Sequence, residues 1–296
     1  MNPPIIHRIG QTKDLLGESP FWDVQAQSLC WIDALGGVLH RLRPATGEAE
    51  RHELPAPLGA IAPCASGAVV VAQKSTFARY DLATRRLEVL ASIGIDHPDV
   101  RLNDGKCDPW GNFIAGTMHI NRQPGDPILG GLYRLSPDRS VQCIAEGFGL
   151  TNGPCFSLDG RTLYVADSPL RTIWAYDYSP EGPLGERRAF VRTESYDAGP
   201  DGATVDAEGF VWTVLPRIGR MARFAPDGQL ERMVALPATY PTSLCFGGPR
   251  HDVAYVTSLS RSTHLKGDAP QDGGLFAVSG LPAAGVPPHC FADQRP

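Results

Sequence analysis

A two-part pattern recurs six times along this 296-residue chain and constrains its fold more than any other feature. Short apolar runs recur at intervals of 38 to 51 residues, at 28–33, 68–72, 112–116, 162–167, 210–213 and 253–257. A second run follows each of them and alternates apolar with polar residues, as a half-covered strand does. These second runs are 38–42, 77–81, 131–135, 173–177, 221–224 and 275–278.

Repeats of this length, each with about four short strands between turn residues, predict an all-β, six-bladed β-propeller. The 32 glycines and 27 prolines are spread along the whole sequence and do not gather into a linker. We therefore expect residues 1–296 to form a single propeller domain, with no long α-helix. Radial closure of the blades leaves few exposed sheet edges.

Composition excludes several classes of partner. The net charge is −5 and no basic cluster is present, so we expect no nucleic-acid partner. No apolar run approaches the length of about 18 residues that spans a bilayer, so we expect no membrane insertion. A closed propeller without heptads also leads us to expect a monomer.

Seven cysteines, an odd number without a CxxC pair, indicate free thiols in a reducing cytoplasm. The first residues also lack the pattern of a secretory signal. Cys64, Cys107, Cys155 and Cys245 each precede a turn and its following strand, in four different repeats. We interpret them as small core residues rather than as nucleophiles or metal ligands.

Four polar clusters lie 10 to 13 residues before a repeated apolar run, at 17–20, 101–105, 151–154 and 200–202. Loops that enter the innermost strands of a propeller crowd around its central channel, so similar offsets predict that these clusters meet there. Their Glu, Asn and Asp oxygens are typical ligands of a hard divalent metal ion. The equivalent segments of the second and sixth repeats, 58–60 and 241–243, carry no carboxylate, which predicts an open or apolar side.

Each cluster taken alone is also compatible with an ordinary turn. Asn152 precedes Gly-Pro and Asp201 precedes Gly, which are common turn sequences. The shared offset favours a common site over four unrelated turns. His119 closely follows the strand predicted at 113–118, and we expect it to face the same channel.

At these residues the chain resembles the family of senescence marker protein (regucalcin), gluconolactonase and luciferin-regenerating enzyme. The matching strings cover nearly the whole chain in order: Leu-Gly-Glu-Ser-Pro at 16–20, Arg-Leu-Asn-Asp-Gly-Lys at 101–106, Gly-Thr-Met at 116–118, Thr-Asn-Gly-Pro at 151–154, Pro-Asp-Gly at 200–202 and Cys-Phe-Gly-Gly at 245–248. His119 after Thr-Met is similar to the bacterial sugar-lactonase branch.

The resemblance implies one divalent metal ion in the channel of a six-bladed propeller. Its ligands would be Glu18, Asn152 and Asp201, with Asn103 in or near the coordination shell. The resemblance also implies that Arg101 and Asn103 contact sugar hydroxyls. Oxygen ligands accept Ca²⁺, Mn²⁺, Fe²⁺, Mg²⁺ or Zn²⁺, so the identity of the metal stays open.

The expected activity is metal-dependent opening of a sugar (aldono-)lactone to the sugar acid by a metal-activated water, with Asp201 as general base. Where the family tends to carry a Gly-rich stretch, this chain has Leu-Pro-Arg-Ile-Gly at 215–219. Arg217 is therefore a candidate partner for an acidic group on the substrate. The alternatives are a calcium-binding regulator, a scaffold that keeps the ion as a structural plug, and a hydrolase of a phosphotriester or aryl ester that uses the same site.

Overall fold

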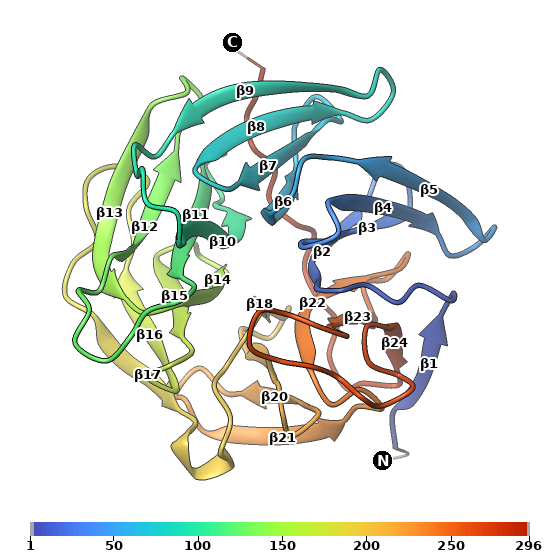
Figure 1. Ribbon diagram of the computed structural model, residues 1–296. Helices are drawn as coiled ribbons and strands as arrows, with labels where there is room; N and C mark the ends of the chain where they lie inside the picture. The colour runs from blue at the N-terminus through green and yellow to red at the C-terminus, as the bar shows by residue number, and fades with distance from the viewer. Residues whose placement is uncertain (1–2, 295–296) are drawn as a thin grey trace.

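The computed structural model describes residues 3–294 and confirms the six-bladed β-propeller. Six four-stranded antiparallel sheets stand around a common axis (Figure 1). In the described residues the only helical segment is a 3-10 turn, η1 (Glu194–Tyr196), which lies before the fifth blade. Residues 3–294 contain no helix that is long and apolar enough to cross a membrane.

Both kinds of predicted run form strands at equivalent places in every blade. The first kind gives the second strands, β3 (Ser28–Asp33), β7 (Val69–Gln73), β11 (Phe113–His119), β15 (Thr162–Asp167), β19 (Val211–Leu215) and β23 (Val253–Ser258). The alternating runs give the third strands, β4 (Val38–Arg43), β8 (Thr76–Asp81), β12 (Gly130–Leu135), β16 (Thr172–Asp177), β20 (Arg220–Phe224) and β24 (Leu275–Ser279).

The innermost strands differ from the expectation. We expected the polar clusters in loops that enter the innermost strands, but three clusters form part of these strands and the fourth lies directly before one. The innermost strands are β2 (Gly17–Asp23), β6 (Leu58–Pro63), β10 (Val100–Cys107), β14 (Thr151–Phe156), β18 (Ala203–Val205) and β22 (Pro241–Gly247).

The outermost strands close the sheets and the ring. They are β5 (Glu48–Glu53), β9 (Arg86–Ser92), β13 (Val141–Phe148), β17 (Arg188–Arg192), β21 (Leu230–Ala235) and β1 (Ile5–Ile9). β1 comes from the start of the chain yet pairs with β24 in the sixth blade (Figure 1). Strands from both ends of the chain thus share one sheet, which fastens the ring.

β-Bulges explain how proline and glycine fit inside the innermost strands. The pairing register shifts between Glu18 and Phe21 in β2, and β10 and β14 shift at the equivalent place. A bulge leaves a residue outside the ladder and re-aims its neighbours, and it is one of the few places where a strand accepts proline. Pro20 and Pro154 lie within two of these shifts. The bulges let polar side chains project toward the channel.

Neighbouring innermost strands approach each other so closely that one position requires glycine. Gly153 has φ +52°, and a Cβ there would lie 2.7 Å from the Cβ of Ala203 in the next blade. Its backbone N–H donates to Asp104 Oδ2 at 2.8 Å. Any larger residue would therefore push the fourth and fifth blades apart and disturb the channel.

The core lies between the blades. Trp212 of β19 is fully buried and its ring contacts Phe246 of β22 edge-on, with ring centroids 5.7 Å apart. Similar apolar clusters fill the other interfaces, and burial of each large side chain contributes about 1.5–3 kcal/mol. Cys64, Cys107, Cys155 and Cys245 are all buried, as expected for core residues. Burial raises the pKa of Cys155 and of Cys245 to about 12, so these thiols stay protonated near neutral pH.

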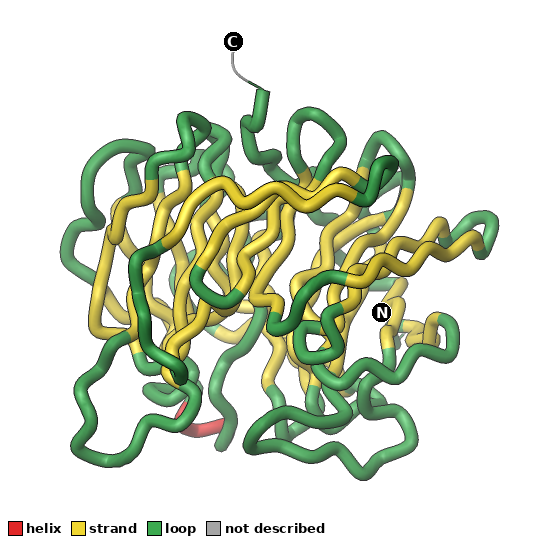
Figure 2. The backbone as a smooth tube through the Cα atoms, turned by 45° about the horizontal axis from the view of Figure 1, so that its top comes forward, coloured by secondary structure: helices red, strands yellow, loops and turns green. Residues whose placement is uncertain are grey.

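The segment after β24 crosses one end of the channel. Gly285 forms a bridge with Asp206 of the fifth blade, and Phe291 forms one with Cys64 of the second. Pro288 and His289, between these bridges, line a small cavity of about 80 Å³ with Lys106 at the ends of the innermost strands. Loops gather at both ends of the strands (Figure 2). A larger cavity lies at the other end, where the innermost strands begin.

Candidate functional site

The larger cavity holds most of the residues predicted for the site. Its volume is about 580 Å³, a size typical of small-molecule sites. The predicted residues that line it are Glu18, Arg101, Asn103, Asn152, Asp201 and Arg217. They come from the first, third, fourth and fifth blades, so the ring closure assembles residues that lie as much as about 200 positions apart in the chain.

Apolar residues from two other blades also line the cavity. The second blade contributes Ala56 and Pro57, and the sixth contributes Leu259 and Leu265. These are the two repeats whose clusters carry no carboxylate. The cavity therefore combines polar and apolar lining residues, and the sixth blade adds the polar Ser262, Thr263 and His264.

A chain of hydrogen bonds holds the amide residues in place. Asn103 Nδ2 donates to Asn152 Oδ1 at 2.8 Å and to the carbonyl oxygen of Thr151 at 2.9 Å. Asn152 Nδ2 donates to Ser168 Oγ at 2.9 Å, and this hydroxyl donates to the Pro200 carbonyl oxygen at 2.6 Å. These bonds connect the third, fourth and fifth blades directly around the channel. They also turn the Asn152 side-chain oxygen toward Asn103.

Arg101 is a buried cation beside this network. It is 5% exposed, and its Nη1 donates to Asn103 Oδ1 at 3.1 Å and to the Leu102 carbonyl oxygen at 2.9 Å. Burial lowers the pKa of the guanidinium to about 10, although the nearby Glu18 carboxylate opposes this shift. Arg101 therefore remains charged at neutral pH and can donate to an oxygen-rich ligand.

The buried carboxyl groups of Glu18, Asp104 and Asp201 repel one another. Burial and the neighbouring Asp201 and Asp104 carboxylates raise the pKa of Glu18 well above its usual range. Burial and Asp104 raise the pKa of Asp201 in the same direction. Like charges that gather in a desolvated place disfavour ionisation unless a cation joins them.

Asp104 is a member of this group that the sequence did not identify. It is buried, and its two carboxylate oxygens accept the backbone N–H groups of Gly105 and Gly153, each at 2.8 Å. Its pKa is raised by burial, with Lys106 acting in the opposite direction. The Asn-Asp-Gly string looks like a turn in the sequence, so only its position at the shared offset could have pointed to Asp104. Ser168 gave no signal in the sequence.

The donor set fits a divalent cation. Asp201 Oδ1 is buried and has no hydrogen-bond partner among residues 3–294, which is costly for a carboxylate oxygen. Glu18, Asn152 and Asp201 line the cavity, and each side chain carries an oxygen of the kind that hard cations prefer. An unpartnered oxygen among repelling carboxylates is the arrangement that a bound cation would stabilise.

His119 is the predicted site residue that the structure places elsewhere. The cavity lining, as far as the described chain defines it, includes Met118 and Ile120 but not His119. Successive side chains of a strand point to opposite faces, so Met118 at the cavity turns His119 away from it. His119 lies instead beside His97 and Asp99. His264, which we did not predict, does line the cavity.

Arg217 lies at the rim of the cavity. It occupies the turn between β19 and β20 with φ +72°, and its side chain is exposed. Its neighbour Pro216 also lines the cavity. The turn thus puts a solvated positive charge at the entrance, apart from the buried charge of Arg101.

Comparison with known proteins agrees with this architecture. Residues 16–260 match the family described as the SMP-30/Gluconolactonase/LRE-like region. The chain is 35% identical to regucalcin of Xenopus laevis over 283 residues, covering 94% of this chain and 95% of the relative. It is 36% identical to 6-deoxy-6-sulfogluconolactonase of Pseudomonas putida over 269 residues, covering 89% and 91%.

Solved structures show the same likeness. A luciferin-regenerating enzyme superposes with a TM-score of 0.89 at 28% identity, covering 98% of this chain and 99% of the other. Regucalcin from Agrobacterium tumefaciens, described as a calcium-binding protein, superposes with a TM-score of 0.89 at 27% identity, covering 98% of both chains. The matched residues include all six predicted residues that line the cavity, from Glu18 to Arg217. The chain belongs to the SMP-30/gluconolactonase/LRE-like family.

Proposed function

We propose that this protein is a divalent-metal-dependent lactonase that hydrolyses a sugar lactone to the open sugar acid. The observation that carries the proposal is the oxygen-rich cluster at the cavity, where the buried Asp201 Oδ1 has no hydrogen-bond partner within residues 3–294 and interacts with Glu18. Arg101 and Asn103 add hydrogen-bond donors suited to hydroxyl groups. The family description includes gluconolactonase, and a relative is named 6-deoxy-6-sulfogluconolactonase; both names support the same chemistry.

The metal would be held by Glu18, Asn152 and Asp201. When bound, a divalent ion supplies Lewis-acid polarisation of a carbonyl group and promotes ionisation of water. Two carboxylates and one neutral amide balance its charge. Their oxygen donors are compatible with Ca²⁺, Mn²⁺, Fe²⁺, Mg²⁺ or Zn²⁺. The name of the Agrobacterium relative as a calcium-binding protein supports Ca²⁺ as the first ion to test.

The residues of the chain then have separate roles. Asp201 accepts a proton from the attacking water as the general base. The water oxygen adds to the lactone carbonyl carbon, the ring C–O bond breaks, and the hydroxyl group of the open acid takes up a proton. Arg101 and Asn103 orient the ring hydroxyls, while Leu259 and Leu265 cover apolar parts of the substrate.

Proton release near neutral pH tests the function directly. Chelator-stripped protein is reloaded with one divalent metal at a time and assayed with neutral and acidic aldonolactones, a phosphotriester and an aryl ester. Metal-restored hydrolysis of a sugar lactone supports the proposal. Faster hydrolysis of the phosphotriester or aryl ester assigns the same site to another ester. Tight metal binding without any hydrolysis favours a calcium-binding regulator.

Arg217 would set a preference for acidic substrates. Its exposed guanidinium at the rim can pair with a carboxylate or sulfonate that projects from the lactone ring. The sulfogluconolactonase among the relatives acts, by its name, on a lactone with such a group. We therefore propose an acidic lactone as the preferred substrate class.

Arg217→Ala is expected to raise KM for an acidic lactone by about fivefold, as suits an exposed ion pair worth up to about 1 kcal/mol. KM for a neutral lactone should hardly change. Arg220→Ala, which alters a nearby cation outside the cavity lining, serves as the control. An equal rise in KM for both lactones would show that Arg217 shapes the rim of the cavity but does not recognise the charge of the substrate.

Asn103→Ala is expected to weaken metal binding and kcat/KM by about 10- to 100-fold, as for other residues that orient a metal ligand. The substitution removes the donor that holds Asn152 Oδ1 at 2.8 Å. Isothermal titration with the activating metal, together with steady-state kinetics, measures both effects. Unchanged metal affinity with a raised KM would restrict Asn103 to substrate binding.

We propose a cytoplasmic location for the protein. All seven cysteines are free in the described structure, which supports a reducing compartment.

A further inference from the structure

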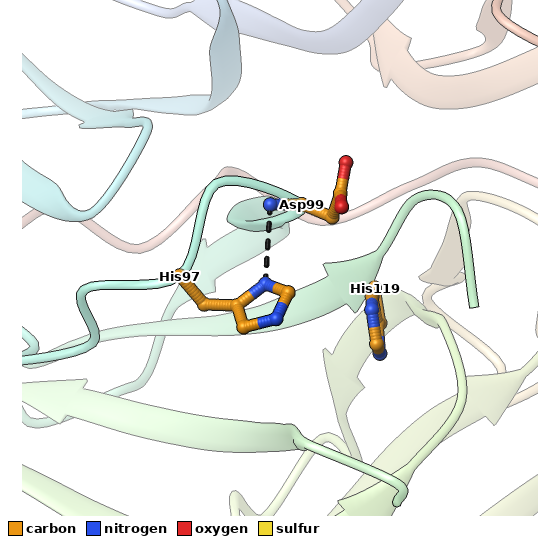
Figure 3. A group of neighbouring side chains, drawn as sticks. All are labelled: His97, Asp99 and His119. Carbon is orange, nitrogen blue, oxygen red and sulfur yellow. Dashed lines mark hydrogen bonds between the residues drawn. The ribbon is translucent and has the colours of Figure 1, made fainter. Parts of the chain in front are cut away.

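A second group of potential metal ligands lies outside the cavity. The side chains of His97, Asp99 and His119 each offer one ligand atom, and these atoms all lie within 4.8 Å of one another. His97 and Asp99 belong to the segment between β9 and β10, and His119 ends β11 (Figure 3). None of the three lines the cavity described above, as defined by residues 3–294.

The three side chains form a cluster in which imidazole nitrogens remain available as metal ligands. The two imidazole rings lie edge to face with centroids 5.0 Å apart. His119 Nδ1 is buried and has no hydrogen-bond partner within residues 3–294. His97 Nδ1 accepts only a long bond of 3.2 Å from the backbone N–H of Asp99. A buried imidazole nitrogen without a partner is unfavourable, and a cation that uses its lone pair removes this cost.

We propose that His97, Asp99 and His119 form a second metal site, selective for a first-row transition ion such as Zn²⁺ or Co²⁺. Two imidazoles and one carboxylate suit these ions, whereas Ca²⁺ and Mg²⁺ prefer oxygen ligands alone. Metal–nitrogen bonds are about 2.0–2.1 Å long, so the three side chains must draw together by roughly an ångström. Small side-chain rotations at the ends of two elements allow this movement.

A neighbouring side chain orients the carboxylate of the site, and a coordination position remains for a further ligand. Asp99 Oδ1 accepts a bond of 2.6 Å from Asn121 Nδ2, which orients the carboxylate from the loop after β11. Three protein ligands leave a coordination position for water or another small ligand. All three residues are partly exposed, so an ion can reach them from solvent.

Such an ion would fix one wall of the cavity. Val100 pairs with His119 and Arg101 pairs with Met118, so the ligands flank the strand that carries Arg101. The Ile120 N–H donates to the Asp99 carbonyl oxygen at 2.8 Å, and the Ile120 carbonyl oxygen contacts His264 Nε2 at 2.9 Å. The ion would therefore join the segment before β10 to the end of β11. Met118 and Ile120, which line the cavity, would lose freedom as a result.

Co²⁺ binding to the full-length protein tests the site, because its visible absorption reports the number and type of ligands. The wild type is expected to bind two equivalents of Co²⁺, and Asp201→Asn is expected to keep one. His97→Ala and His119→Ala should each lose the other equivalent. His7→Ala, which alters an exposed histidine of β1, should match the wild type. Equal stoichiometry in the wild type and His119→Ala would overturn the proposal.

Electron paramagnetic resonance of the Cu²⁺-loaded protein gives an independent measurement that needs no destabilised variant. With excess Ca²⁺ to fill the oxygen site, the wild type should show couplings from two imidazole nitrogens. The conservative variant His119→Gln, checked for folding by circular dichroism, should lose one of them. Absence of nitrogen coupling in the wild type, or its full persistence in His119→Gln, would contradict the site. Neither result depends on lactonase activity.

Discussion

Asp201→Asn is expected to lower kcat/KM of the metal-loaded protein on a sugar lactone by about 10²- to 10⁴-fold, the range for loss of a general base. Asparagine keeps the shape of the side chain and the backbone bond from Asp201 N to the Val214 carbonyl oxygen at 3.0 Å. It removes the charge that would hold the metal and the oxygen that would accept the proton. Metal affinity and activity should therefore fall together.

Two measurements separate the roles of Asp201. Titration calorimetry gives the metal affinity, and proton-release kinetics at saturating metal give the rate of the metal-bound variant. Asp227→Asn, which neutralises an exposed turn carboxylate in the same blade, is the matched control and should behave as the wild type. A variant that regains full activity at high metal concentration would leave Asp201 as a ligand and remove it as the base. Full activity at ordinary metal concentration would end both assignments.

The regular part of the fold could be predicted because it depends on local patterns. The buried second strands are apolar, and the third strands alternate apolar with polar residues. Each of the six blades therefore shows the same two sequence patterns. The innermost strands were harder to recognise. β2 and β14 contain glycine and proline, which usually mark loops, and only the bulges make these residues compatible with a strand.

The candidate site could be predicted in part for the same reason. Glu18, Asn152 and Asp201 occupy equivalent places in their repeats, and ring closure brings equivalent places together. The direction of His119 could not be predicted from its nearness to the channel, because one residue along a strand reverses the face. The group that His119 joins depends on His97 and Asp99, which lie in an irregular segment without a repeat pattern.

Asp104 shows a second limit. Its neighbours Asn103 and Gly105 made it look like a turn former, whereas its actual partners are the backbone of Gly105 and of Gly153 in the next blade. Contacts between blades follow from the tight packing of innermost strands, which a sequence pattern within one blade does not reveal. The charge that Asp104 adds to the channel is therefore visible only in the assembled ring.

Glu18→Gln is expected to affect the metal-free and the metal-loaded protein in opposite directions. The folded pKa of Glu18 is raised well above its usual value of 4.5 by burial and by Asp201 and Asp104. A raised carboxyl pKa means that the folded state binds its proton more tightly than the unfolded state. Its contribution to stability is thus greatest at low pH and is lost as the pH rises toward the folded pKa.

At neutral pH the metal-free Glu18→Gln protein should therefore unfold at a higher temperature than the wild type, by about 2–4 °C for each kcal/mol of repulsion relieved. Its stability should also depend less on pH. With metal present the order reverses, because the variant lacks a ligand and its metal affinity should fall by more than about 100-fold. Thermal unfolding between about pH 5 and 8, with chelator or with metal, measures both effects.

Glu186→Gln neutralises an exposed glutamate and should shift neither curve. If Glu18→Gln lowers the unfolding temperature of the metal-free protein, contacts other than a cation stabilise Glu18. The inference that the three carboxylates repel one another would then be wrong. If it instead raises that temperature and keeps the metal response, the ion is held without Glu18. The expected pair of opposite shifts requires two things: the carboxylates destabilise the metal-free folded protein, and the bound ion stabilises them. This property links metal binding to the chemistry of the cavity.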